Sequence, residues 1–239
     1  MSTASKNQAA VPPAEVRAPG TRAPRPKDAA TVIIYRQRRG RVEVLMGQRH
    51  RKHRFLPQRY VFPGGRVDPC DSRVRSATGL RDDVARRLMR TAAPARARAL
   101  AAAAVRETFE ETGLIIGQPD PEPHRTAPAN WKSFFDTGMA PCFENLVYIA
   151  RAVTPHWRPI RFNARFFMLD SRHVVGDLAG SGELLDLTYV PIAGTAELEL
   201  PLVTTRVLEL VEDLARDPGT LGHVSFFRHN GKAHDLFKE

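Results

Sequence analysis

The sequence has few cysteines and no long apolar run. Only Cys70 and Cys142 occur among the 239 residues, which favours a reducing, cytoplasmic location. The longest uncharged apolar stretch, residues 99–105, is far shorter than the roughly 20 residues that a membrane-spanning helix needs. The first eight residues contain no apolar core of the kind that a secretory signal requires. We therefore expect no membrane segment and no membrane partner.

The composition argues against several fold classes. Hydrophobic residues make up 42% and charged residues 26% of the chain, which argues against wholesale disorder, collagen-like repeats and coiled coil. Residues 1–26 are an exception, because they contain five prolines and almost no large apolar side chain. We expect a disordered basic tail there; an organellar leader is the alternative, against which Glu15 and the prolines argue. Residues 27–239 are then expected to form one domain.

Acidic residues are scarce in the first 60 positions. Residues 1–30 hold five Lys/Arg and two Asp/Glu, a balance of +3, and residues 31–60 hold nine and one, a balance of +8. The other 179 residues hold 22 and 23, a balance of −1, so the total is +10. Concentrated positive charge attracts phosphates and nucleic acids. A solvated surface in an arginine-rich chain explains the same pattern, and both interpretations stay open.

Strand and helix patterns are mixed from residue 31 onward. Runs of β-branched and aromatic residues predict strands over 31–36, 42–46, 60–62, 114–116, 147–153, 165–169, 185–190 and 223–227. Helix-forming residues predict helices over 79–90, 95–112, 131–135 and 204–215, with Pro94 as the break between the first two. Because no regular βαβ alternation occurs, we expect an α+β fold, a mixed central sheet flanked by helices in an α/β/α sandwich.

Three glutamates near the end of the second predicted helix carry the chemistry. On a helix, Glu107, Glu110 and Glu111 fall within a sector of roughly 100°, close to the negative end of the helix dipole. This crowding is unfavourable unless a cation compensates it, and Mg²⁺ or Mn²⁺ suits all-oxygen ligands. The spacing therefore predicts a metal site. A solvated helix end, with Arg106 paired to Glu110, is the structural alternative.

A glycine turn upstream favours the metal interpretation. Phe62-Pro63-Gly64-Gly65 forces a tight turn and leaves the backbone accessible to a metal ion or a phosphate. The strongly basic segment 49–59 lies immediately before this turn. The two features together place positive charge and exposed backbone beside the predicted carboxylate site.

These motifs resemble the Nudix box of the MutT/Nudix hydrolases, G-x5-E-x7-R-E-U-x-E-E-x-G-U, in which U is a bulky apolar residue. The second half of the box fits at Arg106, Glu107, Glu110, Glu111, Gly113 and Leu114, and departs at Thr108. The first half fits at Gly65 and, after five intervening residues, at Asp71, an aspartate in place of glutamate. Between Asp71 and Arg106 lie 34 residues rather than seven, so the box carries an insertion of 27 residues.

An interrupted box of this form is similar to the branch that includes the peroxisomal coenzyme A diphosphatases. The resemblance covers residues 27–215 and implies the Nudix fold with a helical insertion over 72–100. We expect this insertion to cap the active-site cleft, with packing on the outside or against a second subunit as the alternative. Coenzyme A or an acyl-coenzyme A ester is the substrate that the branch implies.

The resemblance also implies a mechanism. Glu107, Glu110 and Glu111 would hold Mg²⁺ or Mn²⁺, which lowers the pKa of a bound water that attacks the diphosphate of a nucleoside diphosphate derivative. Arg106 is expected to orient the glutamates. Asp71 is expected either as a further metal ligand or as a capping or loop residue.

The remaining site residues follow from charge and position. Arg49, Arg54 and Arg59 are candidates for phosphate contacts, together with the Gly64 and Gly65 backbone, although each arginine singly also suits a solvated surface. The general base is not identifiable from the sequence, and Glu144 is a guess for it.

Several alternatives stay open for function. Within enzymes, a dinucleotide, a nucleoside diphosphate sugar or an RNA cap is an alternative substrate. A non-catalytic regulatory or RNA-binding module with a Nudix fold is the competing class, favoured by the basic residues 1–60, Thr108, Asp71 and the interrupted box. Nucleic acid bound through the basic N-terminal region and a homodimer are the further partners considered.

Overall fold

The computed structural model describes residues 16–18, 20–51, 55–122, 127–198, 200–229 and 234–239. Most of the predicted tail, residues 1–15 and 19, lies outside the described residues. The described remainder of the tail contacts the folded chain. The backbone amide of Arg17 donates a hydrogen bond to the carbonyl of Trp157 (2.6 Å), and Arg161 Nη1 donates to the carbonyl of Pro24 (2.8 Å). Arg17 and Pro24 therefore contact the domain. The predicted disorder of residues 1–26 did not include such contacts.

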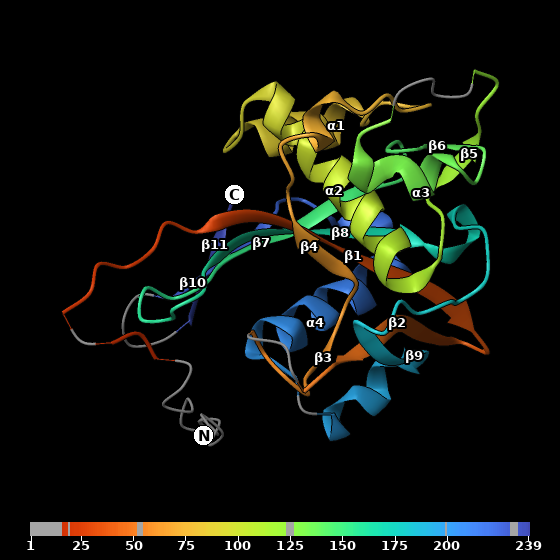
Figure 1. Cartoon of the computed structure of the whole chain (residues 1–239). Coiled ribbons are helices and arrows are strands. Elements are labelled where there is room, and N and C mark those ends of the chain that lie inside the picture. Colours follow the sequence, from red (N-terminus) through yellow and green to blue (C-terminus); the bar gives the residue numbers. More distant parts are fainter. Residues whose placement is uncertain (1–15, 19, 52–54, 123–126, 199, 230–233) are drawn as a thin grey trace.

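A single mixed sheet forms the centre of the domain (Figure 1). Within the described chain nine strands join it, in the order β11-β10-β7-β8-β1-β2-β3, with β4 paired to β1 and β9 paired to β2. Pairs β1–β8 and β7–β10 are parallel and the others are antiparallel. The strands are β1 (Lys27–Arg38), β2 (Arg41–Arg49), β3 (Tyr60–Val61), β4 (Gly64–Arg66), β7 (Val147–Val153), β8 (Phe162–Asp170), β9 (Leu184–Pro191), β10 (Ser225–His229) and β11 (His234–Lys238).

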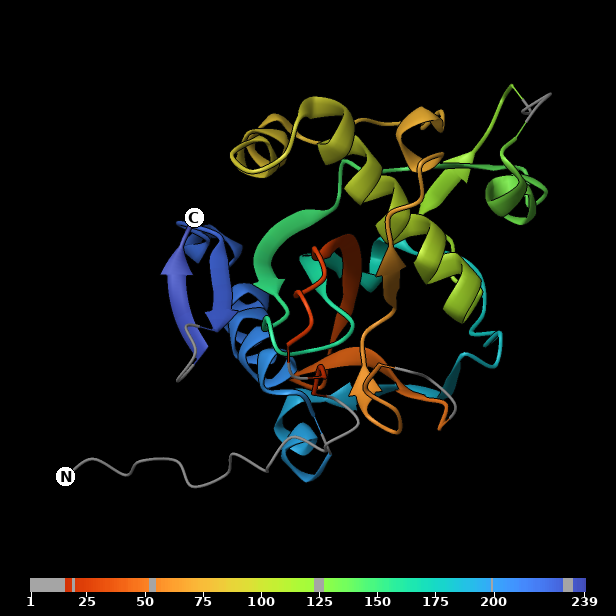
Figure 2. The same cartoon turned by 60° about the vertical axis from the view of Figure 1, so that its left-hand side comes forward.

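Helices cover both faces of this sheet, which confirms the predicted α+β sandwich (Figure 2). The helices are α1 (Asp82–Met89), α2 (Pro94–Thr112), α3 (Lys132–Phe135) and α4 (Leu202–Arg216). Two short strands, β5 (Gly117–Pro119) and β6 (Met139–Pro141), pair with each other apart from the main sheet. None of the described helices is both long and apolar enough to cross a membrane.

The strand predicted over 114–116 is wrong. Only Ile115 forms a single bridge, to Val175, because the chain has just left α2 through the left-handed Gly113 (φ 74°). Strand pairing begins later, at Gly117. Pro94 also differs from expectation, since it occupies the first turn of α2, where a missing N–H costs no hydrogen bond.

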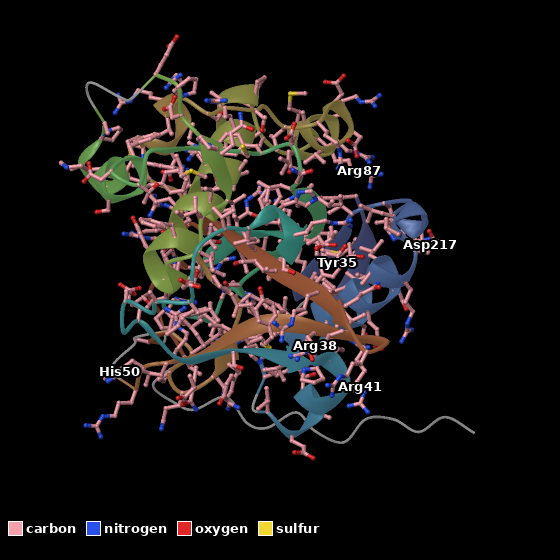
Figure 3. All side chains as sticks on the ribbon, turned by 90° about the vertical axis from the view of Figure 1, so that its right-hand side faces the viewer. Tyr35, Arg38, Arg41, His50, Arg87 and Asp217 are labelled. Carbon is pink, nitrogen blue, oxygen red and sulfur yellow. The ribbon has the colours of Figure 1, made fainter. Side chains whose placement is uncertain are left out.

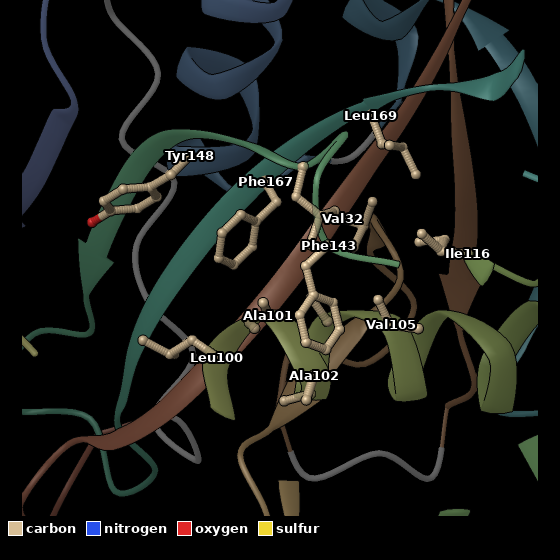
Figure 4. Packing of buried hydrophobic residues seen from close by; sticks show 14 of the residues in the cluster. Val32, Leu100, Ala101, Ala102, Val105, Ile116, Phe143, Tyr148, Phe167 and Leu169 are labelled. Carbon is tan, nitrogen blue, oxygen red and sulfur yellow. The ribbon is translucent and has the colours of Figure 1, made fainter. Parts of the chain in front are cut away.

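Alanines let α2 lie close to the sheet. Ala101 to Ala104 have no exposed surface, and Leu100 and Val105 beside them are equally buried. This face packs against Val32 of β1 and Phe167 of β8 (Figure 4). The small side chains bring the helix backbone near the strands, so the glutamates that follow Val105 are positioned by a tightly packed core.

The inserted segment packs at the start of α2. Val84 and Leu88 of α1 are buried in the same core cluster as Leu100, and Arg87 Nη2 donates to the carbonyl of Leu221 (3.0 Å). α2 has 19 residues and is therefore about 28 Å long. Because α1 lies by the N-terminal half and the glutamates lie in the last two turns, the prediction that the insertion caps the active site is wrong (Figure 1).

The basic residues of segment 31–60 are divided between two places. Arg38 and Arg41 lie at the turn between β1 and β2, whereas His50 directly follows the other end of β2 (Figure 3). The nine residues of β2 separate these positions by about 26 Å. Only the basic residues near the C-terminal end of β2 therefore lie close to the glycine turn.

Candidate active site

β4 and the last turns of α2 bring the predicted carboxylates to the glycine turn. The backbone amide of Gly64 donates to Glu111 Oε2 (2.8 Å). A Cβ atom on Gly65 would lie 2.3 Å from Glu107 Cδ, and one on Gly64 would lie 2.5 Å from the carbonyl oxygen of Ala30. Both glycines are therefore required by close approach, Gly65 to a carboxylate and Gly64 to the backbone of β1.

Arg106 holds the other glutamates. Its Nη1 donates to Glu107 Oε1 (3.0 Å) and to Glu110 Oε2 (2.9 Å). The side chain of Glu107 is 15% exposed and that of Glu110 is 40% exposed, so Glu110 faces solvent beside two buried acids. Two carboxylates thus meet at Arg106, while Glu111 turns to Gly64. In the described part of the chain no three Asp, Glu, His or Cys side chains lie where they could hold one metal ion together.

The carboxylate of Asp71 fixes the position of the Arg106 guanidinium group. Arg106 Nε and Nη2 donate to Asp71 Oδ1 and Oδ2 (3.0 and 3.2 Å), and Arg106 Nη2 also donates to the carbonyl of Arg66 (2.9 Å). The fully buried Asp71 further accepts hydrogen bonds from Trp131 Nε1 (2.9 Å) and the Asp68 amide (2.7 Å). Each carboxylate oxygen already accepts two hydrogen bonds from the protein, so we remove Asp71 from the predicted metal ligands.

Burial raises the pKa of each of these acids. Desolvation raises the pKa of Glu111 to about 8 and the pKa of Glu107 to about 7, against the lowering effects of the Gly64 amide and of Arg106. Desolvation also raises the pKa of Glu110. Arg106 is shared by Glu107, Glu110 and Asp71, so its single positive charge does not compensate the carboxylates of the site. Oxygen donors that are buried together and short of positive charge fit a divalent cation.

The departures from the Nudix box leave this arrangement intact. Thr108 replaces a bulky apolar residue, but it is buried and its hydroxyl donates to the carbonyl of Ala104 (2.8 Å). Asp71 replaces glutamate and still reaches Arg106 with both oxygens. The insertion begins within η2 (Asp71–Arg73) and ends inside α2, before Arg106.

The rim of the site contains two residues of opposite charge. Arg49 is close enough to lower the pKa of Glu111, and its backbone amide donates to the carbonyl of Arg59 (3.0 Å), which brings two predicted phosphate contacts together. The charge of exposed Glu183 raises the pKa of Glu107, Glu110 and Glu111 alike. The predicted contact Arg54 lies outside the described residues.

Glu183 was missed by sequence reasoning, and Glu144 was a wrong guess. The amide of Glu144 donates to Thr78 Oγ1 (3.3 Å), so Glu144 lies beside the inserted segment and away from the glutamates. Glu183 directly precedes β9, which pairs with β2, and its carbonyl oxygen accepts a hydrogen bond from the His50 amide (3.4 Å). No motif marks Glu183 in the sequence, since only the pairing of β9 with β2 brings it to the site.

The geometry agrees with the comparison with known families. Residues 25–153 match the sequence model of the NUDIX domain, which is 129 of 239 residues and more than half of the chain. The chain belongs to the NUDIX family. It is accordingly a hydrolase that acts on pyrophosphate bonds, in a family whose enzymes generally use divalent metal ions.

One solved structure agrees with this assignment, and two more distant ones are also similar. A NUDIX hydrolase from Alicyclobacillus acidocaldarius is 26% identical, with a TM-score of 0.60 over 79% of this chain and 92% of that chain. A MutT NUDIX hydrolase from Burkholderia pseudomallei is 15% identical (TM-score 0.45, 79% and 99% covered), and a C. elegans Ap4A hydrolase is 16% identical (TM-score 0.42, 79% and 98% covered). No curated protein matches the sequence.

Proposed function

We propose that this Nudix hydrolase is a metal-dependent pyrophosphohydrolase that cleaves the diphosphate of a nucleoside diphosphate linked to another group. The observation that carries the proposal is the burial of Glu107 and Glu111 against the Gly64-Gly65 turn, with Glu110 exposed beside them. Residues 27–239 act as one Nudix domain in this proposal.

The proposed metal ligands are Glu107, Glu110 and Glu111, and the proposed ion is Mg²⁺ or Mn²⁺. A bound divalent cation would neutralise charge on the phosphoryl oxygens. It would also lower the pKa of a water molecule bound to it. Arg106 positions the glutamates from its buried pairing with Asp71 and touches no substrate atom. Gly65 leaves room for the Glu107 carboxylate, which a side chain there would displace, and Gly64 leaves room for the backbone of β1.

The rim residues have separate proposed roles. Arg49 and Arg59, with Arg54 from the undescribed stretch, bind phosphate oxygens of the substrate. Glu183 replaces Glu144 as the proposed proton acceptor for the attacking water. Its exposure gives it access to water, and its charge already acts on all three glutamates of α2.

Coenzyme A or an acyl-coenzyme A ester is the leading proposed substrate, because the interrupted box resembles that branch. Dinucleotides, nucleoside diphosphate sugars and RNA caps are the alternatives that an assay must separate. The non-catalytic module loses two of its supports, since Thr108 and Asp71 both preserve the site. RNA binding through residues 1–60 and a homodimer stay predictions.

The experiment is a substrate panel with Mg²⁺ or Mn²⁺, comparing wild type with Glu110→Gln, Glu111→Gln and Glu183→Gln. Glu144→Gln is the matched control, because it removes a carboxylate away from the site. We expect at least about a hundredfold loss of kcat/KM in the three site variants and none in the control. Turnover that survives Glu111→Gln, or no turnover on any substrate, would contradict the proposal.

Metal binding separates the roles of the carboxylates. We expect Glu111→Gln to weaken Mn²⁺ binding, whereas Glu183→Gln retains Mn²⁺ binding and loses kcat. If Glu183→Gln leaves kcat unchanged, the proton acceptor is another group and only that assignment fails.

A further inference from the structure

A second concentration of positive charge lies across the sheet from the active site. A pocket of about 270 Å³ is lined by Arg151 and Val153 of β7, Asn163 of β8, Phe226 and Arg228 of β10, and Pro26 and Arg161. A pocket for a drug-sized molecule holds roughly 300–1,000 Å³, so this volume suits a small ligand.

Two arginines of this pocket repel each other. Arg161 donates only to backbone carbonyls, those of Thr154 (3.0 Å) and Pro24 (2.8 Å). Within the described residues neither Arg161 nor the exposed Arg228 forms an ion pair with a carboxylate. Burial and the nearby charge of Arg228 lower the pKa of Arg161. An anion between the two guanidinium groups would remove this repulsion.

The third arginine is fixed in place. Arg151 Nε donates to Asn163 Oδ1 (2.8 Å), and its Nη1 is paired with Glu239. The guanidinium lies 4.6 Å from the centre of the Phe226 ring. Because Arg151 already covers this ring, the pocket offers charge and hydrogen-bond donors rather than a free aromatic face for a nucleobase.

The pocket is separate from the catalytic residues. β4, which carries Gly64 and Gly65, pairs with one edge of β1, whereas β8, β7 and β10 follow on the other edge (Figure 2). Three strand spacings, about 14 Å, therefore separate β4 from β7. A diphosphate held at the glutamates does not extend to Arg228.

We propose that Arg151, Arg161, Asn163 and Arg228 form a second site, which binds the phosphate group of a small anionic ligand independently of the metal-binding glutamates. The planar guanidinium groups of Arg161 and Arg228 supply charge-assisted hydrogen bonds to phosphate oxygens. Arg151 adds positive charge at the floor, where Glu239 offsets part of it.

The test is calorimetric titration of inorganic phosphate into the full, metal-free chain at low ionic strength. We expect saturable binding in wild type and about a tenfold weaker affinity in Arg161→Gln and in Arg228→Gln. Arg206→Gln, which removes an exposed arginine of α4, is the matched control and should bind like wild type. Added salt should weaken binding, because the attraction is electrostatic.

Two further variants keep this test independent of the proposed function. Arg49→Gln and Glu111→Gln alter the active site and should leave phosphate affinity unchanged. Arg228 is exposed, so Arg228→Gln is expected to fold, and phosphate should raise the Tm of wild type but not of this variant. No saturable binding in wild type, or binding that Arg161→Gln and Arg228→Gln leave intact, would overturn the second site. Loss of binding only in Arg49→Gln would assign the phosphate to the active site instead.

Discussion

Along α2 the buried side chains are apolar up to Val105, whereas from there to the end of the helix they include Arg106 and Glu111. The first part removes hydrocarbon from water and stabilises the fold, at about 25 cal/mol per Å². The second part removes charges from water, which costs free energy unless they are paired. One helix thus contains both the apolar packing that supports the site and the buried charged groups whose desolvation costs free energy.

This contrast explains why the side chains of the site are held in fixed positions although the charges of the carboxylates are not fully compensated. Arg106 is held by Asp71, and Asp71 by Trp131, so the side of the site toward the core is fully paired. On the other side Glu107 and Glu111 are buried with raised pKa values. A rigid site that is short of positive charge attracts a cation.

Gly65→Ala should have the largest effect. The new Cβ would lie 2.3 Å from Glu107 Cδ and would displace that carboxylate. We expect kcat/KM to fall by about a hundredfold or more, because misplacement by about 1 Å has this cost. Steady-state kinetics check the result. Gly79→Ala is the control, since no atom lies within 4 Å of its added Cβ, and equal activity of the two variants would contradict the assigned role of Gly65.

Asp71→Ala tests the paired side. It leaves Arg106 buried without its main partner, and we expect the free energy of unfolding to fall by about 3–5 kcal/mol. Urea denaturation measures this loss. Asp71→Glu keeps the charge and should recover most of the stability, because the family pattern has glutamate here. A loss below about 1 kcal/mol for Asp71→Ala would show that the pairing contributes little.

Leu100→Ala tests the apolar part. Leu100 has no exposed surface, so its truncation should lower the free energy of unfolding by about 2–5 kcal/mol. Activity per folded molecule should stay near wild type, because the glutamates lie two turns further along the helix. Met89→Ala on α1 is the control, since Met89 is 41% exposed and should cost little. Equal costs for the two variants would contradict the packing described for α2.

The pH dependence of stability should be the most gradual effect. Burial raises the pKa of Glu107 to about 7 and of Glu111 to about 8, so the folded protein binds more protons than the unfolded chain above about pH 4.5. The free energy of unfolding of metal-free protein should therefore fall as the pH rises toward 8, by up to about 1.4 kcal/mol per pH unit per proton. Urea denaturation from pH 5 to 9 measures it.

Glu111→Gln sharpens this measurement. The amide cannot ionise, so the variant should be close to wild type in stability at pH 5 and exceed it by up to about 4 kcal/mol at pH 9, which is about 1.4 kcal/mol for each pH unit up to the Glu111 pKa of about 8. Glu209→Gln, which changes an exposed side chain, should show the same pH dependence as wild type. If wild type instead becomes more stable as the pH rises, the two carboxyl groups are not buried as described.

The sequence predicted local elements well because the signals are local. The strand over 147–153 and the helix that ends at Gly113 follow from β-branched runs and from a glycine that accepts positive φ. The short strands β4 and β6 were missed, since three residues contain too little pattern. The cap predicted for the insertion failed for a different reason, because its apolar face gives no information about which end of α2 it covers.

The site residues also divide into those that a local sequence pattern predicts and those that only tertiary contacts bring together. The box residues could be predicted because their spacing is a sequence property. Glu183 could not, because its approach depends on the pairing of β9 with β2, residues far apart in the chain. The bracing role of Asp71 also depends on a distant partner, Trp131 Nε1, which no local pattern connects to the box.

Manganese binding tests the central claim most directly. Calorimetric titration of Mn²⁺ should show binding to wild type and to Glu144→Gln, and binding at least about tenfold weaker in Glu111→Gln. Protons should be released on binding at pH 7, because Mn²⁺ displaces them from carboxyl groups of raised pKa. No Mn²⁺ uptake by wild type, or equal uptake by Glu111→Gln, would contradict the assignment of these carboxylates as the metal site.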